Sequence, residues 1–478
     1  MKGLLLAGLV LVFLRGEAEG EFLELRAAVH IHTIFSGGAR TLDELIEEAR
    51  RERIGALILA DNFLLRFEYG VFPLRGLFKR VVERPSVSPL GSERWLQAIQ
   101  AAQATSPDVI LIPGVEVVPH YYWTGSLLSG DLTMWDAQKN LLVVGLSRLE
   151  HYAELPAVGN RGVFPSGVRG LVMLALAGVA VGGGIVLLRT RRGRAVRYRL
   201  SGSAALGIGV LLLLDAFTSS EIDPYRGNLG IGPYQRVIDY AVARGGAAFW
   251  SFPEARDFGR FDVGPFGTVS VRPEPYPDRL FQSHGYAGFG AVYQDTVTFT
   301  EPGRQWDQLL LEYAEGRRAR PAWGIGELGY HGPPKRLRDV LTVFLVHERS
   351  REAVLSALER GRLYSVRPLP DLSLRLDDFS LSQEAGNQWI PMGGELEAQG
   401  GGALLIRLRV STSDRREVPF TLRLIRSGRL LSVVEGRTPF EKILEAPPPE
   451  PGAREYFRIE ITTPHWLLSN PIFVRRRA

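Results

Sequence analysis

The sequence predicts an α/β domain that is interrupted by a helical hairpin and followed by an antiparallel β domain. Three observations carry this prediction. Apolar segments of strand length alternate with amphipathic segments of helical period. Two long apolar segments stand next to each other around a run of arginines. From residue 372 onward, apolar and polar residues alternate at period two between Gly, Pro and charged turns.

The chain begins with a segment of the secretory type. Met1 to Gly20 opens with a lysine, continues with an apolar run and ends in a small polar stretch. An uncleaved N-terminal anchor is the alternative. Both interpretations place the chain from Glu21 onward outside the cytoplasm. The sequence contains no cysteine, which excludes disulfides, thiolate nucleophiles and cysteine-ligated zinc.

The stretch from Ala27 to Leu45 is expected to form a strand that ends in two histidines and leads into a helix. Because side chains alternate on a strand, His30 and His32 are expected on one face, where two imidazoles can share a metal. Thr41, followed three residues later by Glu44, is typical of a capping box at the start of a helix.

The next buried strand is expected from Ala56 to Ala60, and it ends in Asp61. An acidic residue at the C-terminal end of a barrel strand is a common position for chemistry. Further along, we expect helices at 234–244, 306–314 and 350–360, a strand at 247–250, and a long loop at 257–304.

Two apolar segments in the middle of the chain, Val168 to Leu188 and Leu200 to Phe217, approach the length of a membrane span. The stretch between them, Arg189 to Arg199, carries six arginines. By the positive-inside rule this loop is cytoplasmic, so the hairpin enters from outside and returns there. The alternative is a buried helical hairpin in a soluble oligomer. The formal charge of +5 has its largest cluster in this loop, so no nucleic-acid partner is expected.

The C-terminal part, Leu372 to Ala478, is expected to be an antiparallel β-sandwich of about the usual domain size. No charged or aromatic constellation stands out in it. An interaction or packing role, with an envelope protein as the partner, is therefore the expectation.

Several stretches together resemble the PHP (polymerase and histidinol phosphatase) domain family. The opening HIHTIFSGGARTLDEL is similar to the family's HxHTxxSDGxxTPEEL. The similarity recurs, in the expected order, at IPGVEVV (112–118), NLLVVGL (140–146), YQRVIDYAVARGGAAFWSFPEA (234–255), GELGYHGP (326–333) and AVLSALERGRLYSV (353–366). This resemblance implies a distorted (βα)7 barrel with metal ions at the strand C-termini and hydrolysis of phosphate esters.

Carried over residue by residue, the resemblance implies a reduced metal site. His30, His32 and Glu116 would hold a divalent ion, Zn, Mn or Fe, with Asp61 or Glu327 as a catalytic fourth ligand. Arg362 and His331 would meet the substrate, although a helix-end role for the arginine and a structural role for the histidine are alternatives. His120 is either a replacement ligand or an aromatic-loop residue. At other ligand positions of the family this chain carries Gly37, Asn62, Phe63, Asn140, Phe252 and Gly329.

Two functions follow as hypotheses. The first is a membrane-tethered, extracytoplasmic metal-dependent phosphoesterase that acts on a phosphate ester or another small anionic ligand. The second is a catalytically inactive PHP-like binding or scaffold module of the cell envelope, with no metal required. The expected division is a signal peptide or anchor (1–20), a first barrel part (21–165), a transmembrane hairpin (166–217), a second barrel part (218–371) and the β-sandwich (372–478).

Overall fold

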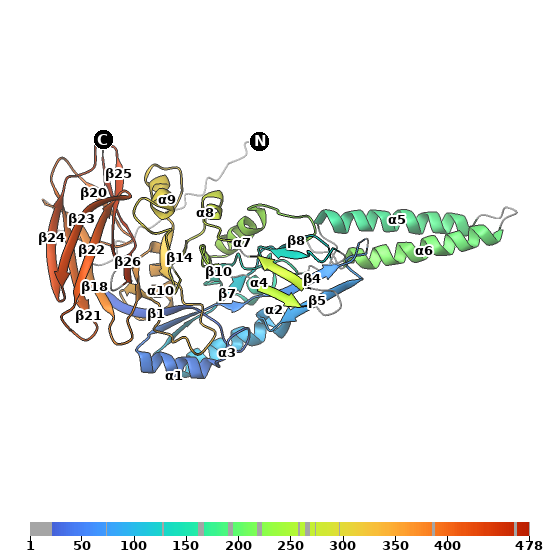
Figure 1. Ribbon diagram of the computed structural model, residues 1–478, viewed down its shortest axis with the longest axis horizontal. Coiled ribbons are helices and arrows are strands. Elements are labelled where there is room, and N and C mark those ends of the chain that lie inside the picture. The colour runs from blue at the N-terminus through green and yellow to red at the C-terminus, as the bar shows by residue number, and fades with distance from the viewer. Residues whose placement is uncertain are drawn as a thin grey trace, which may run out of the picture.

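The computed structural model describes residues 22–72, 74–126, 129–160, 167–189, 195–217, 222–256, 259–262, 268–272, 274–295, 297–384, 388–462 and 466–477. The expected signal peptide or anchor lies outside these residues, as does part of the arginine loop. Within them the chain is a mixed α/β protein with a strand-rich C-terminal region and a long helical hairpin (Figure 1).

The strands of the N-terminal region form one continuous hydrogen-bonded path. β1 (Leu23–Ile31) is parallel to β2 (Ala56–Leu59), which is parallel to β6 (Ile110–Ile112). β2 and β6 run on into a second sheet, whose order is β3 (Asp61–Asn62), β7 (Gly114–Val117), β10 (Leu141–Val144), β11 (Ala247–Trp250), β14 (Gly288–Val292) and β15 (Trp323–Gly326). The segment after β15 then returns to β1, where Tyr330 bridges Ile31.

Helices cover this path as the apolar periodicity predicted. α1 (Leu42–Glu52) begins at Thr41 with the expected capping box and buries its apolar face. The other predicted helices are also confirmed, as α7 (Gly232–Ala243), α9 (Gln305–Ala314) and α10 (Arg351–Arg360). Further helices are α2 (Val87–Leu90), α3 (Ser92–Thr105), α4 (Leu149–Ala153) and α8 (Asp278–Gln282).

The prediction of a long loop at 257–304 is wrong for most of its described length. It contains β12 (Gly259–Asp262), β13 (Thr268–Arg272), α8 and β14. The sequence of β14, GFGAV, shows no strand alternation because all its residues are buried. A Cβ atom at Gly288 would lie 2.1 Å from the carbonyl oxygen of Trp323, so this strand requires glycine where its neighbour approaches.

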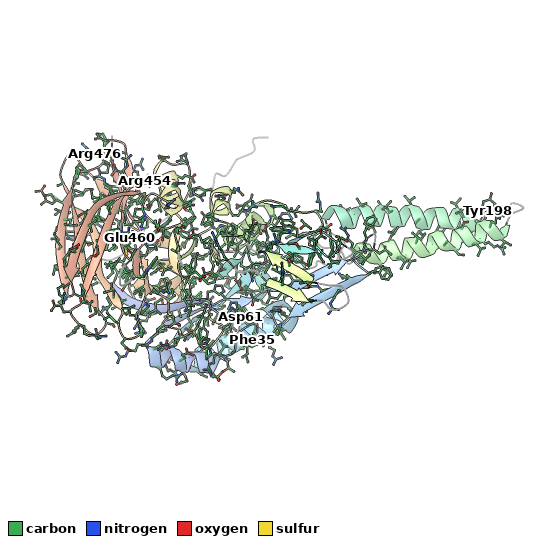
Figure 2. The ribbon with its side chains drawn as sticks, viewed as in Figure 1. Phe35, Asp61, Tyr198, Arg454, Glu460 and Arg476 are labelled. Carbon is green, nitrogen blue, oxygen red and sulfur yellow. The ribbon has the colours of Figure 1, made fainter. Side chains whose placement is uncertain are left out.

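The two apolar segments form α5 (Gly167–Arg189) and α6 (Ala195–Phe217), which pack against each other and project away from the body (Figure 1). Both are long and apolar enough to cross a membrane. Gly184 and Gly202 lie where the helices approach most closely, since a Cβ on either would lie 2.9 Å from the other's carbonyl oxygen. Figure 2 shows Tyr198 at the far end of this hairpin.

Smaller sheets lie between the hairpin and the main path. β4 (Leu65–Gly70) pairs with β5 (Lys79–Arg84), and β8 (Tyr122–Thr124) pairs with β9 (Thr133–Trp135), which in turn pairs with β13.

The C-terminal region contains two sheets that share one apolar core. The first is continuous with β1 through β16 (Leu341–Val346) and β17 (Leu363–Arg367). Its C-terminal strands are β20 (Glu395–Ala398), β22 (Pro419–Arg426), β23 (Arg429–Arg437), β25 (Arg454–Ile461), β26 (Trp466–Ser469) and β27 (Ile472–Arg476). The second sheet contains β18 (Leu374–Gln383), β19 (Ile390–Pro391), β21 (Leu404–Thr412) and β24 (Phe440–Ala446). Ile406 of the second sheet and Leu422 of the first lie in the same core cluster.

A buried ion pair joins this region to the α/β part. The Arg458 guanidinium donates to both oxygens of Asp307 on α9, each at 2.7 Å, and both side chains are fully buried. Such a bidentate pair fixes geometry as well as supplying energy.

Candidate metal centre

His30 and His32 stand at the end of β1, but a simple strand alternation does not position them. The pairing of β1 with β2 shifts register between Val29 and Ile31, and His30 has a φ of 70°. This is a β-bulge with its extra residue in the left-handed region, a conformation that costs a non-glycine residue about 1–3 kcal/mol and is concentrated at functional sites. The bulge turns both imidazoles toward the same point, with their Nε2 atoms 2.9 Å apart.

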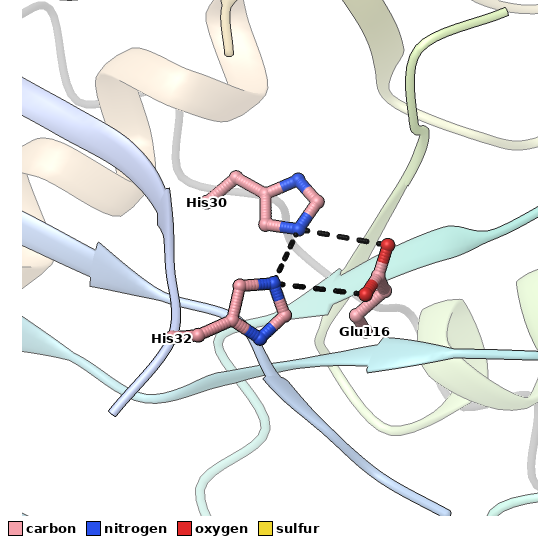
Figure 3. A group of neighbouring side chains, drawn as sticks. All are labelled: His30, His32 and Glu116. Atoms are coloured by element: carbon pink, nitrogen blue, oxygen red, sulfur yellow. Dashed lines mark hydrogen bonds and ion pairs between the residues drawn. The ribbon is translucent and has the colours of Figure 1, made fainter. Parts of the chain in front are cut away.

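Glu116, on β7, completes a group that could hold a metal ion (Figure 3). Its oxygens lie 3.5 Å from Nε2 of His30 and 3.7 Å from Nε2 of His32. A tetrahedral ion with bonds of about 2.0–2.1 Å separates its ligand atoms by about 3.3–3.4 Å. The two distances to Glu116, one to each of its oxygens, are slightly longer than this separation and the distance between the two nitrogens is shorter, and the donor set suits Zn, Mn or Fe.

The other ring nitrogen of His30 is held by Glu327, in the segment that follows β15. The distance from His30 Nδ1 to Glu327 Oε1 is 2.7 Å. Ser251 Oγ and the backbone N–H of Phe252 donate to the same carboxylate. Glu327 is fully buried, and a Cβ at Gly290 would lie 1.9 Å from its Oε2, so the glycine leaves the space this carboxylate occupies.

The other ring nitrogen of His32 is held by a second acidic partner through a hydroxyl group. Ser36 Oγ lies 2.7 Å from Asp61 Oδ1 and 3.3 Å from Nδ1 of His32. Because the serine proton is donated to the carboxylate, Ser36 accepts from Nδ1–H of His32. Each histidine thus directs its N–H away from Glu116 and turns a bare Nε2 toward it, the arrangement found in carboxylate–histidine–metal sites.

Asp61 is buried and surrounded by donors. Besides Ser36, it accepts from the N–H and hydroxyl of Thr33 and from Nε1 of Trp95 at 2.9 Å. Burial raises the pKa of this carboxyl, while these donors lower it. The donors occupy the oxygens with which Asp61 was expected to bind the ion, so the structure gives it the geometry of a residue that positions His32 through Ser36.

Two asparagine side chains meet on Glu116. Asn62 donates to Glu116 Oε2 at 2.6 Å, and Asn140 donates to Oε1 at 2.7 Å. The carboxylate is therefore fixed by two neutral amides and faces the histidines with both oxygens. Oδ1 of Asn140 is buried and has no partner within the described part of the chain, so it can accept from a water or ligand.

Phe252 and Gly329 are complementary in shape. The Phe252 ring stacks on His30, with centroids 5.1 Å apart, and packs edge-on against Tyr293. A Cβ at Gly329 would lie 2.8 Å from Cζ of this ring. The aromatic ring thus fills the space next to His30 and leaves room only for glycine at 329.

His331 lies at the exposed rim of the group. Its ring stacks on His32 with centroids 4.0 Å apart, and Nδ1 lies 3.2 Å from the carbonyl oxygen of Gly37. A Cβ at Gly37 would lie 3.2 Å from His331 Nδ1. The rim position fits either a structural or a substrate-facing role.

Burial and neighbouring charges shift the pKa values of His30, His32 and Glu116 in different directions. Burial disfavours protonated His30, but Glu116 and Glu327 outweigh it and raise the pKa of His30 to about 9. Burial and the neighbouring His30 charge hold the pKa of His32 well below its ordinary value. Burial opposes ionisation of Glu116, yet His30 and its other partners lower the pKa of Glu116 to about 2.

Two other candidates lie elsewhere. Arg362 follows α10, and its guanidinium stacks over the ring of Phe22 at 5.3 Å, at the opposite end of β1 from His30. This position gives no support to a role in substrate binding. His120 is buried and its Nε2 bonds the carbonyl oxygen of Gly227, as expected for an aromatic-loop residue rather than a ligand.

The sequence analysis did not single out Ser36, Trp95, Ser251 or Lys335. Ser36 and Ser251 lie inside blocks of the family resemblance, which was the available signal. Lys335 approaches the site from the segment after β15, where its ammonium donates to the carbonyl oxygens of Leu328 and Gly329, both at 3.0 Å.

No protein-family model and no curated protein matches the chain. Among solved structures, it is similar to a two-domain protein from Bacteroides vulgatus that contains a predicted PHP-like metal-dependent phosphoesterase, with 12% identity over 92% of this chain and 91% of that chain and a TM-score of 0.36. A provisionally assigned metal-dependent phosphoesterase from Bifidobacterium adolescentis is 14% identical over 65% of this chain and 88% of that chain, with a TM-score of 0.29. An amidohydrolase from Chromobacterium violaceum, with bound sulfate and no metal, is 15% identical over 65% and 89%, with a TM-score of 0.28. No shared fold or activity follows from TM-scores and identities this low.

Proposed function

We propose that this chain is a membrane-tethered, extracytoplasmic PHP-like phosphoesterase that works with one divalent ion held by His30, His32 and Glu116. The observation that carries the proposal is the pair of Nε2 atoms at 2.9 Å. Both Nδ1 atoms are engaged by acidic partners, directly through Glu327 and by way of Ser36 through Asp61. Two bare nitrogen lone pairs facing each other repel, so a cation must lie between them, either a proton or a metal ion.

A bound ion would supply a Lewis acid that activates water near neutral pH and neutralises phosphoryl oxygens. The protein's own part is to hold the ligands in one geometry. Glu327 and Asp61 keep the imidazoles oriented and basic, and Asn62 and Asn140 keep the Glu116 carboxylate turned toward them. Glu327 and Asp61 are therefore positioning residues in this proposal rather than the fourth ligand.

The substrate class is a phosphate ester or another small anion. His331 at the rim and Lys335 behind Gly329 are the proposed partners of the anion, and the Lys335 ammonium already donates to the backbone there. Phe252 fills the space beside His30, so the site offers no second pair of histidine ligands at that position. One ion, rather than a bridged pair, is therefore proposed.

The proposed domain division is unchanged from the sequence analysis. The path that returns from the segment after β15 to β1 supports a (βα)7-type barrel spanning 21–165 and 218–371, and the two sheets with one core support a β-sandwich at 372–478. The hairpin at 166–217 would tether the barrel, with the arginine loop in the cytoplasm.

Metal content is the primary test. The full chain, purified in detergent, should carry close to one equivalent of Zn, Mn or Fe by elemental analysis, and the His30→Ala/His32→Ala variant should carry none. His284→Ala is the matched control, because His284 is exposed and outside the ligand group. A wild-type chain with no stoichiometric metal after supplementation would contradict the proposal.

Activity separates the enzyme from the alternative, an inactive binding or scaffold module of the envelope. The metal-loaded chain should release phosphate from generic phosphate esters, and the double histidine variant should not. A chain that binds metal stoichiometrically but releases no phosphate favours the binding module, which the replaced family ligands at Asn62, Asn140 and Phe252 would suit.

Topology has its own test. A reporter fused at Gly193 should behave as a cytoplasmic protein, while one fused after Ala478 should be exported. Export of the Gly193 reporter would contradict the hairpin orientation.

A further inference from the structure

An apolar surface lies on the β4–β5 hairpin, apart from the metal centre. We call it the tip patch and define it as Val71, Phe72, Phe78, Val81 and Val82. The side chains of Phe72 and Phe78 are 74% and 60% exposed, and Val71 is 59% exposed. Two aromatic side chains this open, in the loop that joins the strands of one hairpin, are unusual on a surface that meets only water.

The tip patch lies at the root of the helical hairpin. β4 and β5 run beside the near ends of α5 and α6 (Figure 1), while Tyr198 marks their far end (Figure 2). The N–H of Gly76, in the loop between β4 and β5, donates to Asp215 on the last turn of α6 at 2.5 Å. The loop between β4 and β5 therefore contacts α6 at the end of its apolar segment.

Tyr225 fixes the orientation of the loop. Its hydroxyl accepts from the N–H of Gly70 at 2.6 Å, and the guanidinium of Arg75 stacks over its ring at 4.4 Å. Tyr225 thus contacts the loop at Gly70 and at Arg75. Together with the Gly76–Asp215 hydrogen bond, these contacts fix the position of the loop relative to the end of α6.

Two exposed arginines lie beside the patch on β5, whereas Arg66 and Lys79 pair with Glu83 and Glu68. The β4–β5 hairpin, residues 65–84, carries five Lys or Arg side chains and two Glu side chains. Arg80 and Arg84 on β5 are exposed. Apolar side chains flanked by cations are typical of segments that lie in the interface of an anionic membrane.

We propose that the tip patch docks into the outer surface of the bilayer that α5 and α6 cross, with Phe72 and Phe78 among the upper acyl chains and Arg80 and Arg84 at the lipid phosphates. The inference rests on the proposed membrane hairpin and adds a second contact to it. Two contacts on one body restrict rotation about the hairpin, so the barrel would sit at a fixed angle to the membrane.

A bilayer fits better than a second copy of the chain. The Gly76–Asp215 contact places the loop that carries the patch at the end of α6, so a membrane that surrounds the helices would end beside this loop. Its cations would repel the same cations of a second copy facing it, whereas anionic headgroups would attract them.

The absence of cysteine allows a clean test with single-cysteine variants of the full chain in lipid vesicles. Phe72→Cys and Phe78→Cys carry an environment-sensitive fluorophore in vesicles that contain phosphatidylglycerol and nitroxide-labelled lipids. Val179→Cys in α5 reports hairpin insertion, and Leu430→Cys on β23 is the water-exposed control; both side chains are exposed in the chain itself.

We expect headgroup-proximal nitroxides to quench the labels at 72 and 78 several-fold more strongly than the label at 430, and deep nitroxides to quench the label at 179. Quenching at 179 without quenching at 72 and 78 would overturn the inference and leave the hairpin intact. Absence of quenching at 179 would overturn the hairpin itself, and the inference with it. Labels at 72 and 78 that are shielded from aqueous iodide but not quenched by lipid nitroxides would show that protein covers the patch, which also overturns the inference.

Charge reversal tests the headgroup contact. Arg80→Glu/Arg84→Glu should reduce the lipid quenching of a label at Phe72→Cys in vesicles with phosphatidylglycerol and have a smaller effect in neutral phosphatidylcholine vesicles. Equal quenching before and after reversal in both kinds of vesicle would refute the part of the proposal that assigns these arginines to lipid phosphates.

Discussion

Glu327→Gln tests the central claim that acidic partners behind the histidines make the metal site. The change keeps the size of the side chain and removes its charge, so the partner of His30 Nδ1 becomes neutral. His30 has its pKa raised from 6.5 to about 9, and the two carboxylates beside it are responsible for this. Burial opposes this rise, so the combined effect of Glu116 and Glu327 is larger than the net change in the pKa of His30.

Glu116 is the larger contributor, and removal of the Glu327 charge should lower the pKa of His30 in the metal-free variant. For the loaded site, loss of an outer partner of a ligating histidine typically weakens metal binding by about 10–100-fold. Competition with a chromogenic chelator measures the affinity, and nitrogen-detected NMR of protein labelled only at histidine measures the pKa.

Glu48→Gln is the matched control. Glu48 is also buried, and it accepts from the hydroxyl of Tyr330 at 2.8 Å, outside the ligand group. It should leave metal affinity unchanged even if it lowers stability. A Glu327→Gln variant with wild-type affinity and an unchanged pKa of His30 would refute the assignment of Glu327 as the residue that orients this imidazole.

Three further predictions concern the same network. Trp95→Phe removes one donor from Asp61, so it should lower the free energy of unfolding by about 1.5–3 kcal/mol in denaturant titrations. The metal stoichiometry should stay the same. Loss of the metal in this variant would indicate that Asp61 is itself a ligand. Gly290→Ala places a Cβ 1.9 Å from Oε2 of Glu327, so its metal affinity by calorimetry should fall at least as far as that of Glu327→Gln, and an unchanged affinity would contradict the packing. In the metal-free chain, the raised pKa of His30 stabilises the fold fully below pH 6.5, and this stabilisation is lost as the pH rises through about 9. The urea midpoint of unfolding should therefore fall over this interval. A midpoint that rises would contradict the direction of the pKa shift.

The ligand group could be predicted from the sequence because its signals are local or belong to recognisable blocks. His30 and His32 are two residues apart, and Glu116 ends a short apolar strand. The reason given for the convergence of the histidines was incomplete, however. Strand alternation alone would place them on one face, whereas the structure turns them together through a bulge at His30. An apolar strand sequence gives no signal that a histidine in it has a backbone conformation in the left-handed region.

The roles of Asp61 and Glu327 could not be predicted, because they depend on contacts between residues far apart in the sequence. Whether a buried carboxylate binds an ion or a histidine N–H depends on which hydrogen-bond donors already occupy its oxygens. Ser36 and Trp95 reach Asp61 from a turn and from α3, and Ser251 reaches Glu327 from the end of β11. The short apolar strands that deliver these donors were predictable, but their relative register was not.

The residues around Glu116 and His30 give the strongest argument that this site is organised. Cavities and unpaired polar atoms are costly in a packed interior, and within the described residues Oδ1 of Asn140 is one such unpaired atom. Here Asn62 and Asn140 donate to opposite oxygens of Glu116, and the ring of Phe252 fits where only Gly329 leaves space. Both pairs are complementary, one in hydrogen bonding and one in shape. The three convergent side chains and these complementary neighbours are the basis on which one ion is proposed, and a histidine in place of Phe252 would remove the ring that packs against His30.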